Sequence, residues 1–202
     1  MRRATILTLS GALALLLTVP ALAALAPGAK APDFDLVDTA GRHHSLQKYL
    51  ADGKIVVLEW FNPDCPFIVK HHKLHKTMDT TYASVKEQGV VWLAINSSAA
   101  GKSGHGLERN VKAVEEFGMT FPVLLDPTGA TGMAYEARNT PTMFVIGRDG
   151  LVAYAGAIDD DKSPQDLGKT NHVAEALAAV LAGGKPAVTE TKPYGCSVKY
   201  AD

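Results

Sequence analysis

Cysteine is scarce in this sequence: its 202 residues include only two, Cys65 and Cys196. Two cysteines can form at most one disulfide, and a domain of this size does not need a covalent staple to fold. The small disulfide-scaffolded proteins are therefore excluded. A basic excess is also missing, since 20 Lys and Arg residues face 21 Asp and Glu residues. Without a basic patch interleaved with aromatic side chains, nothing predicts a nucleic acid as partner.

Long apolar runs are missing after the N-terminus. There, Arg2 and Arg3 precede an uncharged apolar stretch over residues 6–19 that closes on small residues near Ala23. This order is typical of a secretory signal peptide, and the stretch is shorter than the roughly 20 residues that a membrane-spanning helix needs. We predict a signal peptide over residues 1–23 and a mature chain that is secreted into a periplasm without a membrane span.

The hydrophobic pattern predicts alternating strands and helices. Residues 33–37 alternate like a half-buried strand and lead through a glycine turn into residues 43–46, which predicts an N-terminal β-hairpin. Two β-branched runs without alternation have the character of central strands covered on both faces. These strands are expected over 55–58 and 90–95, helices over 66–88, 107–117 and 173–181, and a second hairpin over 143–146 and 151–154. The order predicts an α/β/α sandwich with a mixed central sheet.

Cys65 lies where the first central strand leads directly into a helix. The first amides of a helix have no intrahelical partner and carry partial positive charge, so they stabilise a thiolate, the reactive form of cysteine. Pro66 supports the helix start, because proline is favoured at the first helical position. The carboxyl ends of strands are also where open α/β sheets place their ligands. These features make Cys65 the candidate nucleophile.

Four short motifs occur in an order that resembles the thioredoxin superfamily. They are Ala31-Pro32-Asp33-Phe34, the strand–Cys65–Pro66–helix junction, Asn139-Thr140-Pro141-Thr142 before an apolar run, and Asp149-Gly150. The sequence is most similar to the exported redoxins and to the peroxiredoxin-like branch of the alkyl hydroperoxide reductase and thiol-specific antioxidant (AhpC/TSA) family. The resemblance implies a thioredoxin-like domain over residues 29–182, followed by a tail of residues 183–202 that carries Cys196.

The same resemblance assigns roles around Cys65. It implies that Pro141 is a cis-proline beside the active cysteine, with Thr140, Pro141 and Pro66 at the substrate-binding surface. Asn62 and Trp60, in the segment that leads to the cysteine, are expected to support the site.

Two departures from the family pattern are visible. Thioredoxins carry a second cysteine three residues after the nucleophile, where this sequence has Ile68. Peroxiredoxins carry a threonine three residues before their cysteine and a proline seven before it, where this sequence has Asn62 and Leu58. Arg138 could replace the peroxiredoxin arginine but does not occupy a matching position. Neither standard active site is complete.

The sequence allows several roles for Cys196. It could be a resolving thiol, a permanent disulfide partner of Cys65 or an unrelated thiol, and we favour a reversible disulfide formed by a mobile tail.

The first hypothesis for the function of the protein is an exported thiol-disulfide oxidoreductase that acts on protein thiols or disulfides with an external thiol reductant and no cofactor. The second is a thiol peroxidase, in which a hydroperoxide oxidises Cys65 to a sulfenic acid. A binding module without redox activity is a further alternative.

A cluster of histidines follows Cys65 and suggests a third function. His71 and His75 are four residues apart and so share one helix face, and with Cys65 they could bind copper for delivery. The simpler interpretation, which we prefer, is a solvated basic face that includes Lys70 and Lys73. His43 and His44, in the opening hairpin, are expected to face solvent.

Overall fold

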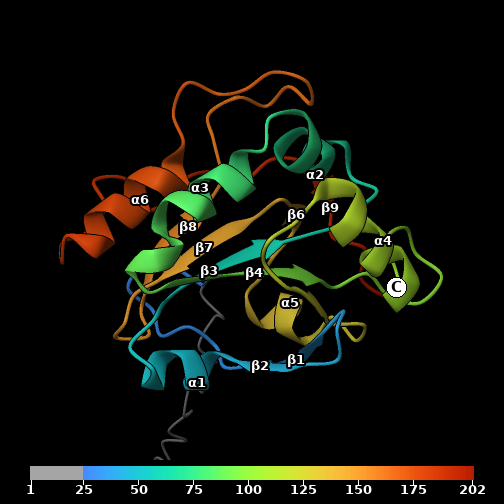
Figure 1. Cartoon of the computed structure of the whole chain (residues 1–202), viewed down its shortest axis with the longest axis horizontal. Coiled ribbons are helices and arrows are strands. Elements are labelled where there is room, and N and C mark those ends of the chain that lie inside the picture. Colours follow the sequence, from blue (N-terminus) through green and yellow to red (C-terminus); the bar gives the residue numbers. More distant parts are fainter. Residues whose placement is uncertain (1–24) are drawn as a thin grey trace, which may run out of the picture.

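A seven-stranded mixed sheet forms the centre of the molecule (Figure 1). The computed structural model describes residues 25–202, so the predicted signal peptide lies outside the described residues. The strands are β1 (Asp35–Asp38), β2 (His43–Ser45), β3 (Ile55–Trp60), β4 (Val90–Asn96), β5 (Val123–Leu125), β7 (Met143–Ile146) and β8 (Val152–Gly156). Their spatial order is β2-β1-β5-β4-β3-β7-β8, with β3, β4 and β5 parallel and the other pairs antiparallel. The predicted opening hairpin and mixed sheet are confirmed.

Helices cover both faces of this sheet. They are α1 (Leu46–Ala51), α2 (Pro66–Val69), the π-helical η1 (Lys70–Leu74), α3 (Thr77–Val85), the 3₁₀ turn η2 (Lys86–Gln88), α4 (Leu107–Phe117), α5 (Ala130–Ala134) and α6 (His172–Leu181). In Figure 1, α2, α3 and α6 lie above the central strands β3, β4 and β7, α1 and α5 lie below these strands, and α4 stands at their right-hand end. The chain therefore has the three-layer, thioredoxin-like architecture that was predicted. In the part of the chain that the structure describes, no helix is long and apolar enough to cross a bilayer.

Strand β3 separates two hydrophobic cores. All six of its residues are buried, which explains the absence of alternation in its sequence. Because successive side chains of a strand point to opposite faces, Ile55 and Val57 join the core that contains Cys65, whereas Leu58 and Trp60 join the core on the other face. The cysteine thus belongs to the layer formed by α2, α3, α4 and α6.

The long helix expected over residues 66–88 is interrupted, which corrects the prediction. After α2 the chain widens into η1, where the amide of His75 bonds the carbonyl of Lys70 at 3.0 Å. Lys76 then adopts a left-handed conformation, with φ of 55°, before α3 begins. Such a π-helical turn changes which side chains face inward. Here it places three successive polar residues, Lys70, His71 and His72, in the interior.

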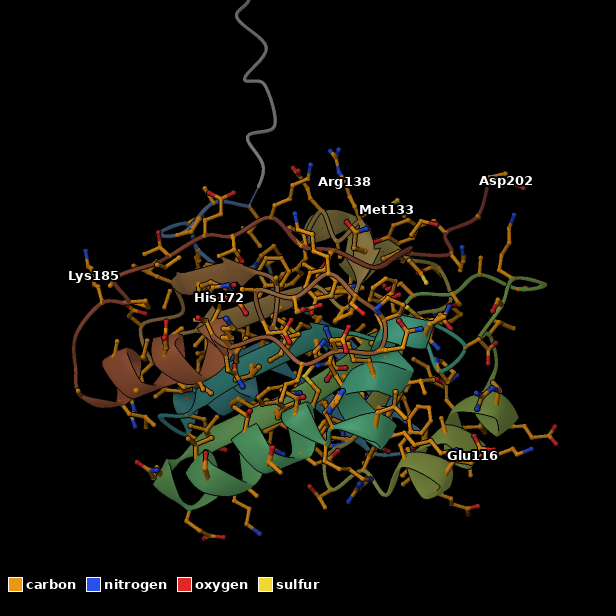
Figure 2. All side chains as sticks on the ribbon, turned by 90° about the horizontal axis from the view of Figure 1, so that it is seen from above. Glu116, Met133, Arg138, His172, Lys185 and Asp202 are labelled. Atoms are coloured by element: carbon orange, nitrogen blue, oxygen red, sulfur yellow. The ribbon has the colours of Figure 1, made fainter. Side chains whose placement is uncertain are left out.

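The C-terminal tail is bound to the domain, although its sequence suggested a mobile segment. It runs along the domain from Lys185 to Asp202 at the opposite end (Figure 2). Backbone hydrogen bonds hold it at several points, including Thr191 to Ala155 at 3.1 Å and Val198 to Arg138 at 3.0 Å. Midway, β9 (Cys196–Ser197) pairs antiparallel with β6 (Asn139–Thr140) as a separate two-stranded sheet.

Candidate active site

Cys65 occupies the N-cap of α2, directly after the end of β3. Its backbone is extended, with φ of −82° and ψ of 124°, while Pro66 is the first helical residue. The Cys65 carbonyl accepts hydrogen bonds from the amides of Ile68 and Val69, both at 3.0 Å, so the helix begins at the cysteine. The local sequence therefore folds as expected, with proline at the position where its missing amide does no harm.

The turn before Cys65 is fixed by Asn62 and Asp64. The Asn62 side chain accepts from the Asp64 amide at 2.9 Å and donates to the Ser103 carbonyl at 3.0 Å. Asp64 accepts from the Arg109 guanidinium at 2.8 Å and from the Ser103 hydroxyl at 2.9 Å. Burial opposes ionisation of Asp64, but these hydrogen bonds outweigh it and lower its pKa. The turn is thus tied to the loop before α4, and the side chain of Asn62 is committed to that role.

Thr140, the last residue of β6, and Pro141, which follows it, face the cysteine. The Thr140–Pro141 peptide bond is cis, as the family resemblance implies. The Cys65 thiol donates a hydrogen bond to the Thr140 carbonyl, with 3.1 Å from Sγ to O. Cys65 is only 2% exposed, so in this arrangement the nucleophile is covered.

The tail packs against the hydrophobic cluster that contains Cys65 and brings the second cysteine to the first. In the β6–β9 pair, Cys196 lies opposite Thr140. Burial, followed by the hydrogen bond and charge of neighbouring Cys65, raises the pKa of Cys196 to about 12. Both cysteines are free thiols. The structure therefore places together the two cysteines that the sequence analysis singled out.

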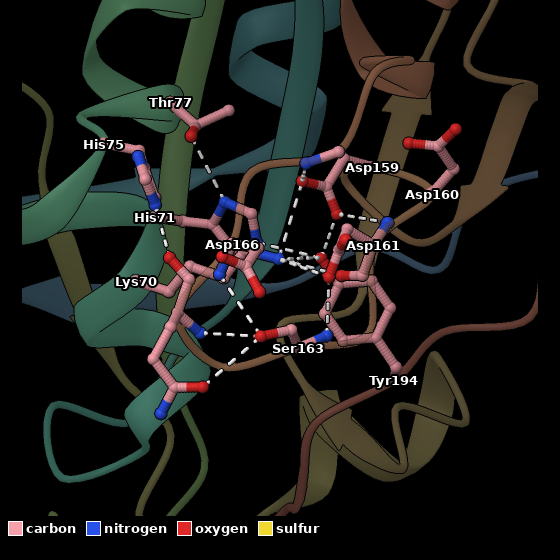
Figure 3. A network of polar contacts seen from close by, with 12 residues as sticks. Lys70, His71, His75, Thr77, Asp159, Asp160, Asp161, Ser163, Asp166 and Tyr194 are labelled. Atoms are coloured by element: carbon pink, nitrogen blue, oxygen red, sulfur yellow. Dashed lines mark hydrogen bonds and ion pairs between the residues drawn. The ribbon is translucent and has the colours of Figure 1, made fainter.

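Tyr194, two residues before Cys196, anchors the tail in a buried polar cluster (Figure 3). Its hydroxyl donates to the carboxylate of Asp159 and lies 2.9 Å from Nε2 of His71. Lys70 lies 3.6 Å from the same carboxylate and 5.2 Å from the centre of the Tyr194 ring. Burial and the Asp159 hydrogen bond raise the pKa of Tyr194 far above its usual value. The Tyr194 phenol is therefore neutral, and its hydroxyl donates a hydrogen bond to the Asp159 carboxylate.

The predicted solvated basic face is wrong. Lys70 and His71 are fully buried, because η1 turns them toward Tyr194 and Asp159. Burial lowers the pKa of His71 to about 3, although Asp159 acts in the opposite direction. Lys73 alone keeps the predicted exposure in this group.

The proposed copper set is not assembled either. Both ring nitrogens of His71 are engaged, by Thr77 and Tyr194, and Nε2 of His75 contacts the Gln165 carbonyl at 2.7 Å. Within residues 25–202, no group of three His, Cys, Asp or Glu side chains is placed to hold a metal ion. Cys65, His71 and His75 therefore do not form a common ligand set.

A second buried ion pair lies beneath the same helical segment. His72 Nε2 contacts Glu59 at 2.6 Å, and the other Glu59 oxygen accepts from the Trp92 indole at 3.1 Å. Burial disfavours the charged imidazole, but Glu59 and Asp79 outweigh it and raise the pKa of His72 to about 9. The pair fixes η1 to strands β3 and β4.

The structure also places three further residues that the sequence analysis considered. Trp60, expected to support the site, packs on the other face of the sheet against Tyr135 and Phe144, with ring centres 5.2 Å and 5.5 Å away. Arg138 is exposed. His44, expected to face solvent, is buried and contacts Asp38 at 2.9 Å.

Sequence reasoning missed the residues that hold the tail: Lys70, Asp159, Tyr194 and Gly195. Gly195 has φ of +113°, and a Cβ atom there would lie 2.1 Å from the Thr140 carbonyl oxygen. Only glycine fits such a close backbone approach. The order Tyr194-Gly195-Cys196 could have drawn attention to this segment, but the residues that it contacts are distant in the sequence.

Fold and site together define a thioredoxin-like oxidoreductase: a cysteine at the start of a helix, after a central strand, faces a cis-proline. The chain belongs to the Redoxin family, whose model matches residues 26–174. It is 35% identical over 129 residues to the thiol-disulfide oxidoreductase ResA of Geobacillus kaustophilus, covering 64% of this chain and 68% of that protein.

Two solved structures show the same fold. A hypothetical protein from Sinorhizobium meliloti superposes with a TM-score of 0.78 at 29% identity, covering 87% of this chain and 94% of that one. The thioredoxin domain of a thiol-disulfide oxidoreductase from Bacteroides vulgatus superposes with a TM-score of 0.52 at 22% identity, covering 63% and 86%. The latter likeness concerns the fold alone.

Proposed function

We propose that this protein is an exported thiol-disulfide oxidoreductase in which Cys65 is the nucleophile and Cys196 the resolving thiol. The observation that carries the proposal is the meeting of the two cysteines at one backbone group, the Thr140 carbonyl region beside the cis-proline. The ResA relatives, which are named as thiol-disulfide oxidoreductases, support the reaction class. The N-terminal pattern around Arg2, Arg3 and Ala23 supports export.

The reaction consists of two thiol-disulfide exchanges. In the first, the Cys65 thiolate attacks one sulfur of a partner's disulfide, that bond breaks, and the partner's other sulfur leaves as a thiolate. In the second, Cys196 loses its proton and attacks the Cys65 sulfur of the mixed disulfide. The partner leaves reduced, and Cys65 and Cys196 are oxidised to a disulfide. An external thiol reductant then restores both thiols.

The arrangement also supports a role for the Thr140 backbone in holding the partner. A cysteine-bearing strand paired with Thr140 brings its sulfur to Cys65, as β9 does. The partner therefore needs the same edge that β9 occupies, and the tail must leave before the first exchange and return for the second.

Trapping of the mixed disulfide tests the proposal. Cys196→Ser, given an oxidised model protein, should accumulate a covalent complex through Cys65, whereas wild type should release the partner and end with a Cys65–Cys196 disulfide. Mass spectrometry before and after a mild dithiol measures both products. If Cys65 forms no mixed disulfide in either protein, the proposal is wrong. Rapid sulfenic acid formation with peroxide would instead favour the thiol peroxidase, the alternative that the family resemblance suggests.

A further inference from the structure

The tail pairs with the backbone of Thr140, where we propose that the substrate binds. The contacts of the tail therefore indicate which kind of segment can bind there. From Tyr194 to Cys196, successive residues fill the polar cluster of Figure 3, pass the Thr140 carbonyl and present a sulfur to Cys65. We propose that the preferred partners present a disulfide-bonded cysteine in an extended segment of the order aromatic-glycine-cysteine, which displaces the tail. This inference rests on the proposed function and names its substrate class.

The glycine follows from the register. A segment that pairs as β9 does places the residue before its cysteine where Gly195 lies, with φ of +113°. Any Cβ atom there would approach the Thr140 carbonyl oxygen to 2.1 Å, which no side chain tolerates without moving the backbone. A partner with another residue at this position cannot bring its sulfur into the same place beside Cys65.

The aromatic residue follows from the cluster that holds Tyr194. The ring packs edge-on against Phe67, with ring centres 5.7 Å apart, and lies beneath the Lys70 ammonium. Its hydroxyl reaches Asp159 and His71, and these two side chains and Lys70 are all buried. Without the phenol, the buried side chains of Asp159 and His71 would each lose a hydrogen-bond partner, which costs free energy. A partner that replaces the tail is therefore favoured if it supplies a tyrosine two residues before its cysteine.

The covalent step in the test is a balanced exchange. Each probe peptide carries its cysteine as a mixed disulfide with 5-thio-2-nitrobenzoate. The Cys65 thiolate attacks the peptide sulfur, the original sulfur–sulfur bond breaks, and the coloured nitrobenzoate thiolate leaves with the electron pair. Release of that thiolate reports the rate.

Three peptides and two full-length variants test the inference. One peptide copies residues 192–199, the second has alanine in place of its glycine, and the third has alanine in place of its tyrosine. The host proteins are Cys196→Ser, which removes the competing thiol, and Cys196→Ser with Gly195→Ala, whose tail cannot approach Thr140. We expect the copy peptide to react at least about tenfold faster than either altered peptide in both hosts. It should also react faster with the double variant, because there the edge is free.

Equal rates for the three peptides would overturn the inference. The symmetrical disulfide of 5-thio-2-nitrobenzoate, which needs no backbone pairing, separates that result from a failure of the proposed function. If the symmetrical reagent reacts with Cys65 while the peptides do not differ, the preference is wrong and the thiol-disulfide activity stands. If Cys65 reacts with neither, both proposals fail. Should the double variant not fold, the ranking of peptides in Cys196→Ser alone decides the question.

Discussion

Cys196 lies directly opposite Thr140, whose carbonyl oxygen also accepts a hydrogen bond from the thiol of Cys65. One backbone position thereby aligns two cysteines from distant parts of the sequence. Cys65 is 2% exposed, and Cys196 packs against the hydrophobic cluster that contains it. We therefore expect access to the nucleophile to depend on how firmly the tail is held.

Gly195→Ala should uncover Cys65. Its new Cβ atom would clash with the Thr140 carbonyl, so the β6–β9 pairing should open and alkylation of Cys65 should become several-fold faster. Mass spectrometry of the carbamidomethylated protein measures this rate. Gly184→Ala is the matched control, because a Cβ atom there makes only an ordinary 3.5 Å contact with the Ala179 carbonyl. An unchanged rate in Gly195→Ala would show that the tail does not limit access.

Tyr194→Phe should destabilise the fold by about 1–3 kcal/mol, since it removes the phenol that satisfies the buried Asp159 carboxylate and His71. Urea unfolding measures the change. Tyr200→Phe is a control in the same tail: its hydroxyl donates only to a neutral carbonyl, that of Ala137 at 2.7 Å, so its loss should cost about 0.5–1.5 kcal/mol. Equal losses in the two variants would argue against the special role of the cluster.

Lys70→Met should cost more than either tyrosine change. Lys70 is fully buried 3.6 Å from Asp159 and donates to the Asp161 carbonyl at 2.8 Å. Removing one member of a buried ion pair leaves the other charge uncompensated, which typically costs about 3–5 kcal/mol. Lys73→Met, on the exposed side of the same helical turn, should stay within about 0.5 kcal/mol of wild type in the same unfolding assay. Similar stabilities for the two variants would contradict the buried role of Lys70.

The sequence predicts the parts of this fold that depend on local pattern. The β-branched run of β3 indicates burial on both faces, and Cys65-Pro66 after it indicates a helix start. The Asp149-Gly150 turn correctly predicts the β7–β8 hairpin. In each case the signal and the structure lie within a few consecutive residues.

Features that depend on distant partners could not be predicted. Lys70 and His71 look like surface residues, because charged side chains are rarely buried without a partner. Their partners, Asp159 and Tyr194, are far away in the sequence. The pairing of Cys196 with Thr140 involves strands of two residues each, which are too short to produce a periodic pattern.

The buried His72–Glu59 pair predicts that the free energy of unfolding decreases as the pH becomes alkaline. The pKa of His72 is raised from 6.5 to about 9 in the folded protein, so the charged imidazole stabilises the fold fully below pH 6.5. This contribution, on the order of 3 kcal/mol, is lost as the pH rises through 9. His72→Gln should therefore remove much of the decline in unfolding free energy between pH 6.5 and 9. A decline of unchanged size in the variant would assign it to other groups.

The neighbouring His71 provides an internal comparison with the opposite sign. Its pKa is lowered from 6.5 to about 3, mainly by burial, so the folded protein keeps it neutral where the unfolded chain would bind a proton. Its contribution is present above pH 6.5 and is lost as the pH falls toward 3. His71→Gln should flatten the acidic limb of the stability curve and leave the alkaline limb intact, whereas His72→Gln should do the reverse. Urea unfolding of both variants from pH 4 to pH 9 measures the two limbs. If either variant altered the wrong limb, the assignment of these two buried environments would be incorrect.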